Sequence, residues 1–346
     1  MSFKYKILEK IKNKISSKCY LDDSLYKNNK ITFLDIGSLG NLKWPITSID
    51  KKFINILKFD AQYIDNYSNS KDKFNNLLWS TEEEKDFYIN QGVETSSLFK
   101  PNLELLKYYP DIERFNVIST NKIKTTTLKN LLIKNKNCDF LKLDVQGSEL
   151  EVLKGANDIL LDNLVGLEIE VSFAEIYINQ PLFSDIDIFL RENYKLQLWD
   201  LNSQYFLFKN INNARFNNKG RLMWADALYL RPIEDIEIWL QKFDNNIAKQ
   251  KILSLIGITS AYGYNDYILT LLQNKKVTKL FNQHELNSLK LMLKKNSTLF
   301  KIKLLNNFIF FLFSTIANIF RPVHNKFSYG SSNLGTRKFL RYFFKQ

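Results

Sequence analysis

Residues 139–156 read DFLKLDVQGSELEVLKGA, and this stretch decides the fold. We expect a short apolar strand that ends at Asp144, followed by a turn at Gly147. Ser148 and Glu151 fit the S-x-x-E capping box that opens a helix. The helical pattern extends over residues 148–161, with Gly155 as a candidate helix end. A buried strand that passes through a glycine turn into a helix predicts a parallel α/β sheet.

The flanking sequence continues this alternation on both sides. Strand candidates lie at residues 31–36, 54–59, 76–80, 140–143, 164–173, 194–201 and 224–230. Helical patterns separate several of them, notably at residues 148–161 and 184–191. The order predicts an α/β sheet with helices on both faces. We also expect a hairpin near residues 77–88.

A candidate ligand loop follows the first predicted strand, in residues 33–40 (FLDIGSLG). The strand ends near Asp35, and Gly37 and Gly40 enclose the loop that contains Ser38. Glycine lets backbone approach a ligand closely, and open α/β sheets bind ligands at the carboxyl ends of their strands. A nicotinamide site would have G-x-G-x-x-G, whereas this loop has only G-x-x-G. The acid suits a cationic ligand such as S-adenosylmethionine, and a structural turn is the alternative.

Further polar residues are predicted at the same edge of the sheet. Asp60 closes the strand over residues 54–59, where an acid can accept hydrogen bonds from both hydroxyls of a ribose. Asp144 and Gln146 stand where the strand over residues 140–143 meets the next helix. A solvated strand end for Asp60 and a capping role for Asp144 are the alternatives.

Taken together, these motifs resemble the FkbM family of S-adenosylmethionine-dependent methyltransferases. The central match is DVQGSELEVLKG at residues 144–155. DIGSLG at residues 35–40 is similar to the family's first cofactor motif, and Phe59-Asp60 is similar to its second-strand acid. Supporting matches are SSLFKPN (96–102), TTTL (125–128), EIEVSF (168–173) and WADALY (224–229). The resemblance covers residues 31–232.

The resemblance implies a class I methyltransferase fold, which is a Rossmann-like, seven-stranded, mostly parallel sheet, with S-adenosyl-L-methionine as cofactor. It also implies O-methylation of a hydroxyl, often on a sugar of a surface glycan or on a related metabolite. The expected cofactor contacts are Asp35, Gly37, Ser38, Gly40, Asp60, Asp144 and Gln146. The family more often has Glu at the position of Gln146, and we expect no metal ligands.

A sugar hydroxyl is a poor nucleophile, so a positioned base would assist its attack. Both histidines follow residue 283, which leaves Asp144, Glu149, Glu168, Glu170 or a water as candidates. Glu168 and Glu170 share one face of an apolar strand, and a central strand rarely buries unpaired carboxylates. We expect Glu170, which is nearer the strand end, to be the base. Asp144 could instead hold the amino group of the cofactor's methionine.

The net charge of +13 suggests a nucleic-acid partner at first sight. However, residues 286–346 hold eleven Lys or Arg and no Asp or Glu, whereas the other 285 residues hold 38 basic and 36 acidic side chains. Phosphate binding needs basic side chains along the substrate track, so the near-neutral body argues against nucleic acid. We expect the basic tail to contact an anionic membrane surface, which would make the protein cytoplasmic and peripheral on the inner face of the membrane.

Three regions are expected along the chain. Residues 1–30 contain a basic amphipathic helix, residues 31–233 form the methyltransferase domain, and residues 234–346 form a helical domain with the basic tail. The uncharged run at 304–320 could be buried, interfacial or spanning. Two cysteines, Cys19 and Cys138, cannot build a disulfide framework, which favours a reducing compartment. A homo-oligomer is left open.

Three other functions fit parts of the sequence. An inactive, methyltransferase-like binding module is supported by Gln146, which stands where the family more often has Glu. A nucleic-acid methyltransferase is favoured by the basic tail alone. A nicotinamide-dependent oxidoreductase would use a similar sheet, but Asp35 and the missing glycine argue against it.

Overall fold

The computed structural model describes residues 19–37, 45–59, 73–74, 77–132, 138–156, 158–209, 220–296 and 329–330. These residues divide into two compact units. One unit holds residues 19–33, 45–56 and 232–296; the other holds residues 34–37 and 57–59, the described residues between 73 and 231, and residues 329–330. The predicted helix near the N-terminus, the site candidates Ser38, Gly40 and Asp60, and the run at 304–320 lie outside the described residues.

The first unit is largely helical. Its helices are α2 (Asp23–Tyr26), α8 (Ile236–Leu240), α9 (Asn245–Tyr262), α10 (Asn265–Leu271) and α11 (Lys275–Thr278), with short 3-10 helices η1 (Ile46–Ser48), η2 (Lys51–Phe53) and η6 (Ile233–Asp235). Helical backbone also covers residues 283–296.

Helix α9 is the centre of this unit, because it is buried over most of its length. The Asp244 carboxylate accepts hydrogen bonds from two backbone N–H groups at its start, and Gly263 ends it with a φ of +89°. Tyr26 donates a hydrogen bond of 2.8 Å from its hydroxyl to the Leu253 carbonyl. Gly257 faces Ile31 so closely that a Cβ would lie 2.6 Å from the isoleucine side chain. The glycine therefore permits close packing of α9.

The main sheet has the order β11-β9-β10-β8-β7-β1-β2-β3. Its strands are β1 (Ile31–Ile36), β2 (Ile54–Phe59), β3 (Lys73–Phe74), β7 (Phe140–Leu143), β8 (Gly166–Ser172), β9 (Gln197–Phe206), β10 (Arg221–Leu230) and β11 (Tyr329–Gly330). β2 pairs with β3, and β7 with β8, in parallel. β10 is antiparallel to both β8 and β9. The predicted α/β class is confirmed, whereas the expected seven strands are not, because the described sheet has eight and two of these are only two residues long.

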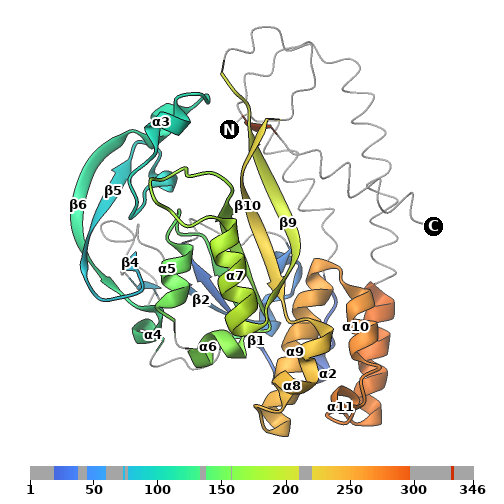
Figure 1. Cartoon of the computed structure of the whole chain (residues 1–346). Helices are drawn as coiled ribbons and strands as arrows, with labels where there is room; N and C mark the ends of the chain where they lie inside the picture. The colour runs from blue at the N-terminus through green and yellow to red at the C-terminus, as the bar shows by residue number, and fades with distance from the viewer. Residues whose placement is uncertain are drawn as a thin grey trace, which may run out of the picture. The chain divides into compact units, whose positions relative to one another are not determined.

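One face of this sheet is apolar and is covered by three helices of the second unit, α5 (Glu149–Lys154), α6 (Asp158–Asn163) and α7 (Phe183–Tyr194). Figure 1 shows α5 and α7 side by side over the strands. The sheet contributes to this core alternate side chains, which include Leu141, Leu143, Ile169, Val171, Ala225 and Ala227. Since neighbouring side chains along a strand point to opposite faces, the residues between them, Lys142, Glu168, Glu170 and Asp226, line the other face.

A second, three-stranded sheet has the order β4-β6-β5. It consists of β4 (Leu77–Leu78), β5 (Glu84–Asn90) and β6 (Val117–Thr126). The predicted hairpin over residues 77–88 is wrong, because β4 and β5 both pair with β6, which lies between them. The connection from β5 to β6 carries η4 (Val93–Thr95), α3 (Leu103–Leu106) and η5 (Ile112–Phe115), and α4 (Leu128–Leu131) follows β6.

The long helix predicted over residues 148–161 is divided into α5 and α6. Gly155 ends α5 where its backbone lies against Trp79, the residue that follows β4. A Cβ on Gly155 would lie 2.2 Å from the Trp79 carbonyl oxygen. This approach leaves no room for a side chain. The helical period continues in the sequence, but the close packing at Gly155 interrupts it.

Arg231 joins several elements of the second unit beneath the sheet. The side chain is only 1% exposed, and its guanidinium donates hydrogen bonds to the carbonyls of Leu164 at 2.9 Å, Leu161 at 3.2 Å and Asp162 at 2.6 Å. It also donates to the Tyr194 carbonyl at the end of α7. One buried side chain thus satisfies the orphan carbonyls at the ends of both α6 and α7.

Candidate active site

The site is built where β1 and β7 end. The Asp144 N–H donates to the Ile36 carbonyl at 3.1 Å, and the Gly37 N–H donates to the Phe59 carbonyl at 2.8 Å. Gly37 has a φ of +81°, and a Cβ on it would lie 1.8 Å from the Asp144 carbonyl oxygen. Only glycine permits this approach. The structure therefore brings the predicted loop after β1 directly against Asp144.

Asp35 lies inside this strand end rather than on the surface. Its side chain is fully buried, and Lys58 on β2 places its Nζ 3.7 Å from Asp35 Oδ2. A buried carboxylate is costly without a cation or donors, so Lys58 offsets part of that cost. Asp35 also helps to raise the pKa of Lys142, so Lys142 is a second cation that interacts electrostatically with Asp35.

Gln146 connects two of the predicted carboxylates. Its side-chain Nε2 donates to Asp144 Oδ1 at 3.0 Å and to Glu170 Oε1 at 3.3 Å. Its Oε1 accepts a hydrogen bond of 2.9 Å from the Tyr177 hydroxyl, and its backbone carbonyl accepts one of 2.6 Å from Ser97 Oγ. The residue has a φ of +55°. Every polar atom of the amide is therefore engaged, at a left-handed position that favours few side chains.

Glu149 holds the turn between β7 and α5. It is 4% exposed, and its Oε1 accepts hydrogen bonds from the N–H groups of Val145 at 2.8 Å and Gly147 at 3.2 Å. Burial raises the pKa of Glu149 to about 7, these backbone donors oppose the rise, and Asp144 adds to it. The sequence placed Glu149 among the candidate bases, and the structure places it under the turn, facing backbone.

The predicted capping box is wrong. Ser148 makes no side-chain capping bond, and its hydroxyl is buried without a hydrogen-bond partner among the described residues. Glu151 instead accepts from the Ser80 hydroxyl at 2.6 Å and pairs with Lys154 at 2.7 Å. The box fails because the Ser148 hydroxyl makes no capping bond and the Glu151 carboxylate is bound to Ser80 and Lys154.

Glu168 and Glu170 lie two residues apart on β8 and face different partners. Glu168 stands opposite Lys142 in the parallel pair, and Glu170 stands opposite Asp226 in the antiparallel pair. Burial, followed by Asp144, Glu149 and Asp226, raises the pKa of Glu170 well above its usual range, and only Lys142 opposes this. Glu170 is therefore the carboxyl group of the site that most readily holds a proton.

Lys142 places a buried cation on this face. Its Nζ lies 3.4 Å from Asp144 Oδ2, and the side chain is only 9% exposed. Burial alone would lower the pKa of Lys142, but the surrounding carboxylates, Asp144 first, raise it on balance. A lysine inside the strand FLKL, two residues before an acid on the same face, was the sequence signal for this pair, which our sequence analysis did not use.

Tyr177 is a second residue that the sequence analysis missed. It is buried, and its hydroxyl reaches both Gln146 Oε1 and the Thr95 carbonyl, the latter at 2.8 Å. Burial raises the pKa of this hydroxyl well above 10, so Tyr177 keeps its proton and acts as a donor. No local pattern marks it, because its partners are far from it in the sequence.

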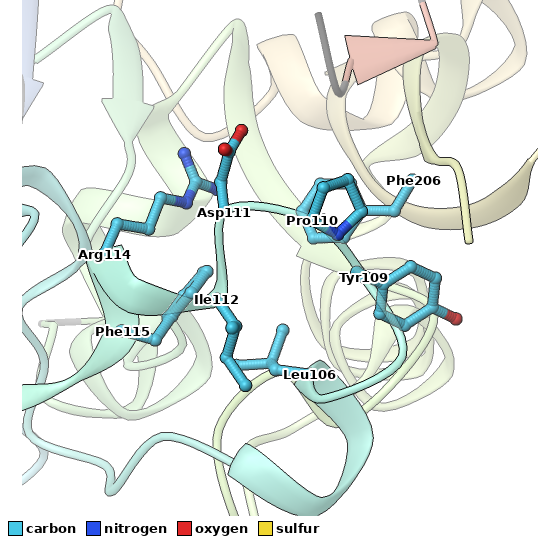
Figure 2. A pocket seen from close by; sticks show the side chains of 8 residues that line it. All are labelled: Leu106, Tyr109, Pro110, Asp111, Ile112, Arg114, Phe115 and Phe206. Carbon is cyan, nitrogen blue, oxygen red and sulfur yellow. The ribbon is translucent and has the colours of Figure 1, made fainter. Parts of the chain in front are cut away.

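A shallow hollow lies beside this network. It is an open surface depression and not an enclosed cavity, and Figure 2 shows its lining. The aromatic rings of Tyr109, Phe115 and Phe206 line it, with the side chains of Asp111 and Arg114 together at one end. Phe115 packs edge-on against Tyr177, with ring centroids 6.1 Å apart. The hollow is therefore one side chain removed from the network of Gln146.

Carboxylates at the ends of β1 and β7, with a glycine that admits backbone contact, define the ligand edge of a methyltransferase-type α/β fold. The comparison with protein families agrees, because the family model described as "Methyltransferase FkbM domain" matches residues 66–196. Residues 66–196 thus match the FkbM methyltransferase domain, and the resemblance seen in the motifs is confirmed. No curated protein and no solved structure matches the chain.

Among the residues that the structure describes, no group of three or more His, Cys, Asp or Glu side chains is arranged to hold a metal ion. Within the same ranges, no helix is both long enough and apolar enough to cross a membrane.

Proposed function

We propose that this chain is an S-adenosylmethionine-dependent O-methyltransferase that acts on a hydroxyl of a sugar, in a surface glycan or a related hydroxylated metabolite. The observation that carries the proposal is the pair of carboxylates Asp144 and Glu170, bridged by Gln146 at the end of the sheet beside Gly37. This pair lies in the part of the chain that matches the FkbM domain.

The residues at this edge fit the proposed cofactor. S-adenosylmethionine, when bound, supplies a methyl group on a positively charged sulfur. Asp144, whose side chain is 20% exposed, offers a carboxylate to the cationic part of such a ligand. Gly37 brings backbone to the same place. We assign these two residues and Asp35 to the cofactor edge, together with Ser38, Gly40 and Asp60, which the sequence places in the adjoining loops.

Glu170 is the proposed base. Burial and the neighbouring carboxylates raise the pKa of Glu170, so in its ionised form it binds a proton more tightly than an ordinary glutamate does. In the step we propose, the acceptor's oxygen would form a bond to the methyl carbon as the bond from that carbon to the cofactor's sulfur breaks. The sulfur would keep the electron pair and leave as the neutral thioether S-adenosylhomocysteine, and the acceptor's proton would pass to the Glu170 carboxylate. Glu149 suits this role less, because it faces the backbone of the turn, and Glu168 stands opposite Lys142.

We propose that the acceptor binds on the side of the Gln146 network where the hollow lies. Aromatic rings offer flat apolar faces with defined edges, while Arg114 and Asp111 offer donors and acceptors that hydroxyl groups can use. This combination supports a hydroxylated, largely uncharged acceptor. It also supports the choice of a sugar over nucleic acid, because phosphate recognition would call for several cations along the track.

We further propose that the basic tail at 286–346 attaches the enzyme to the cytoplasmic face of an anionic membrane. The support is its eleven Lys and Arg without any acid, because each basic residue near such a surface gains about 1 kcal/mol. The tail would bring the enzyme to membrane-bound acceptors.

A thermal protection experiment tests the proposed cofactor. Because a ligand stabilises the fold that binds it, S-adenosylhomocysteine should raise the melting temperature in a concentration-dependent way, whereas NAD should not. Protection by NAD alone would point to the oxidoreductase alternative. Protection by neither would point to an inactive binding module and would contradict the proposal.

A further inference from the structure

Gln146 occupies a place where a side chain with two N–H donors is needed. Asp144 and Glu170 each direct one oxygen at its Nε2, at 3.0 and 3.3 Å. An amide nitrogen has two hydrogens, so it can serve both carboxylates at once. A glutamate at this position would bring a third acceptor against the same two oxygens and would have no donor unless it were protonated.

The amide is also held from the opposite side. The Tyr177 hydroxyl lies 2.9 Å from Gln146 Oε1 and 2.8 Å from the Thr95 carbonyl, so its single proton is shared between two acceptors. The backbone is held as well, because Ser97 Oγ donates to the Gln146 carbonyl at 2.6 Å. Gln146 cannot turn its nitrogen away from the carboxylates without placing its own oxygen against Asp144 Oδ1 and Glu170 Oε1.

We propose that Gln146 is a positioning residue for methyl transfer, which holds Asp144 and Glu170 at a fixed separation and supplies the donors that let both carboxylates occupy the site. This inference rests on the proposed function, in which Asp144 faces the cofactor and Glu170 takes the acceptor's proton. In this chain the glutamine is thus a working part of the site and not a mark of lost activity.

The electrostatic surroundings make this bridge sensitive to charge. The charged and titratable groups around the pair are Asp144, Glu149, Glu170, Asp226, Lys142, Tyr177 and Arg114. Carboxylates outnumber cations among them, and burial already raises the pKa of Glu170. A further carboxylate would therefore be forced to hold a proton, or would push the existing pair to hold one more.

The first test compares Gln146→Glu with the wild-type protein in melting experiments from about pH 5 to about pH 8. A carboxyl group with a raised pKa in the folded state stabilises below its unfolded pKa, and this stabilisation is lost as pH rises. The variant should therefore melt close to wild type at the acid end and progressively lower as pH rises. Gln180→Glu is the control, because its Oε1 accepts from the Tyr177 N–H at 2.6 Å and a carboxylate can keep that bond. Equal pH dependence of the two variants would overturn the proposal.

The second test measures kcat/KM against pH for methyl transfer to a sugar acceptor. Gln146→Glu should move the acidic limb upward by about one pH unit or more. Gln146→Asn keeps an amide that tolerates the left-handed backbone but is too short to reach both carboxylates, so kcat should fall roughly tenfold or more. A wild-type profile in both variants would overturn the proposal.

Failure of the wild-type protein to bind S-adenosylhomocysteine would instead count against the proposed function, and the melting experiments would still decide whether Gln146 bridges the two carboxylates.

Discussion

Replacing Glu170 by Gln should reduce methyl transfer by about 10²- to 10⁴-fold, which is the usual contribution of a general base. The reason lies in the position of Glu170, which is bridged through Gln146 to Asp144 and has a pKa raised by burial and by three neighbouring carboxylates. The amide in the variant has nearly the same shape but cannot take the acceptor's proton. The measurement is transfer of labelled methyl groups to a sugar acceptor, with S-adenosylhomocysteine binding measured alongside.

Glu168→Gln is the matched control, because it makes the same change on the same face of the same strand. Glu168 stands opposite Lys142, farther from the end of β8, so its variant should lose much less activity than Glu170→Gln. Near-normal turnover of Glu170→Gln with normal cofactor binding would exclude Glu170 as the base. A larger loss in Glu168→Gln would transfer the role to that residue.

Replacing Arg231 by Met should destabilise the protein by about 4 kcal/mol or more. The substitution leaves the carbonyls of Leu161, Asp162, Leu164 and Tyr194 without their shared donor in the interior. A buried acceptor that loses its partner costs about 1–3 kcal/mol, and methionine can fill the space but can donate nothing. Chemical denaturation monitored by circular dichroism measures the loss.

Arg191→Met is the control for removing one arginine from the same unit. Arg191 is half exposed and pairs with Asp187 one helical turn away at 3.2 Å, and such surface pairs contribute about 0–1 kcal/mol. If the two variants lost the same small amount of stability, the interpretation of Arg231 as the common donor for α6 and α7 would be wrong.

Strands with apolar runs were the part of the fold most accessible from sequence. The predicted bounds of β1, β2 and β7 agree with the structure. β1 and β7 are buried over nearly their whole length, and such strands are marked by their own apolar composition. The hairpin and the long helix after Ser148 were not predicted correctly. Both depend on contacts between distant residues, namely the insertion of β6 between β4 and β5 and the packing of Gly155 on Trp79.

The candidate site shows the same division. Asp144, Gln146 and Glu149 belong to one continuous motif, so their neighbourhood could be predicted from sequence. Their separate roles could not be predicted, because they depend on the folded geometry. Only there does Glu149 accept hydrogen bonds from the backbone of the turn and Gln146 donate to the carboxylates. Tyr177 carries no local signal at all, since its hydroxyl partners come from other parts of the chain.

The central claim is that this edge of the sheet binds S-adenosylmethionine through its carboxylates, and calorimetric titration with S-adenosylhomocysteine tests it most directly. The wild-type protein should bind, and Asp144→Ala and Asp60→Ala should each weaken binding about tenfold or more, because each removes a hydrogen bond or charge contact worth about 1.5–3 kcal/mol. Asp86→Ala, an exposed acid on β5, should bind like wild type. Unchanged affinity in both Asp144→Ala and Asp60→Ala would contradict the account.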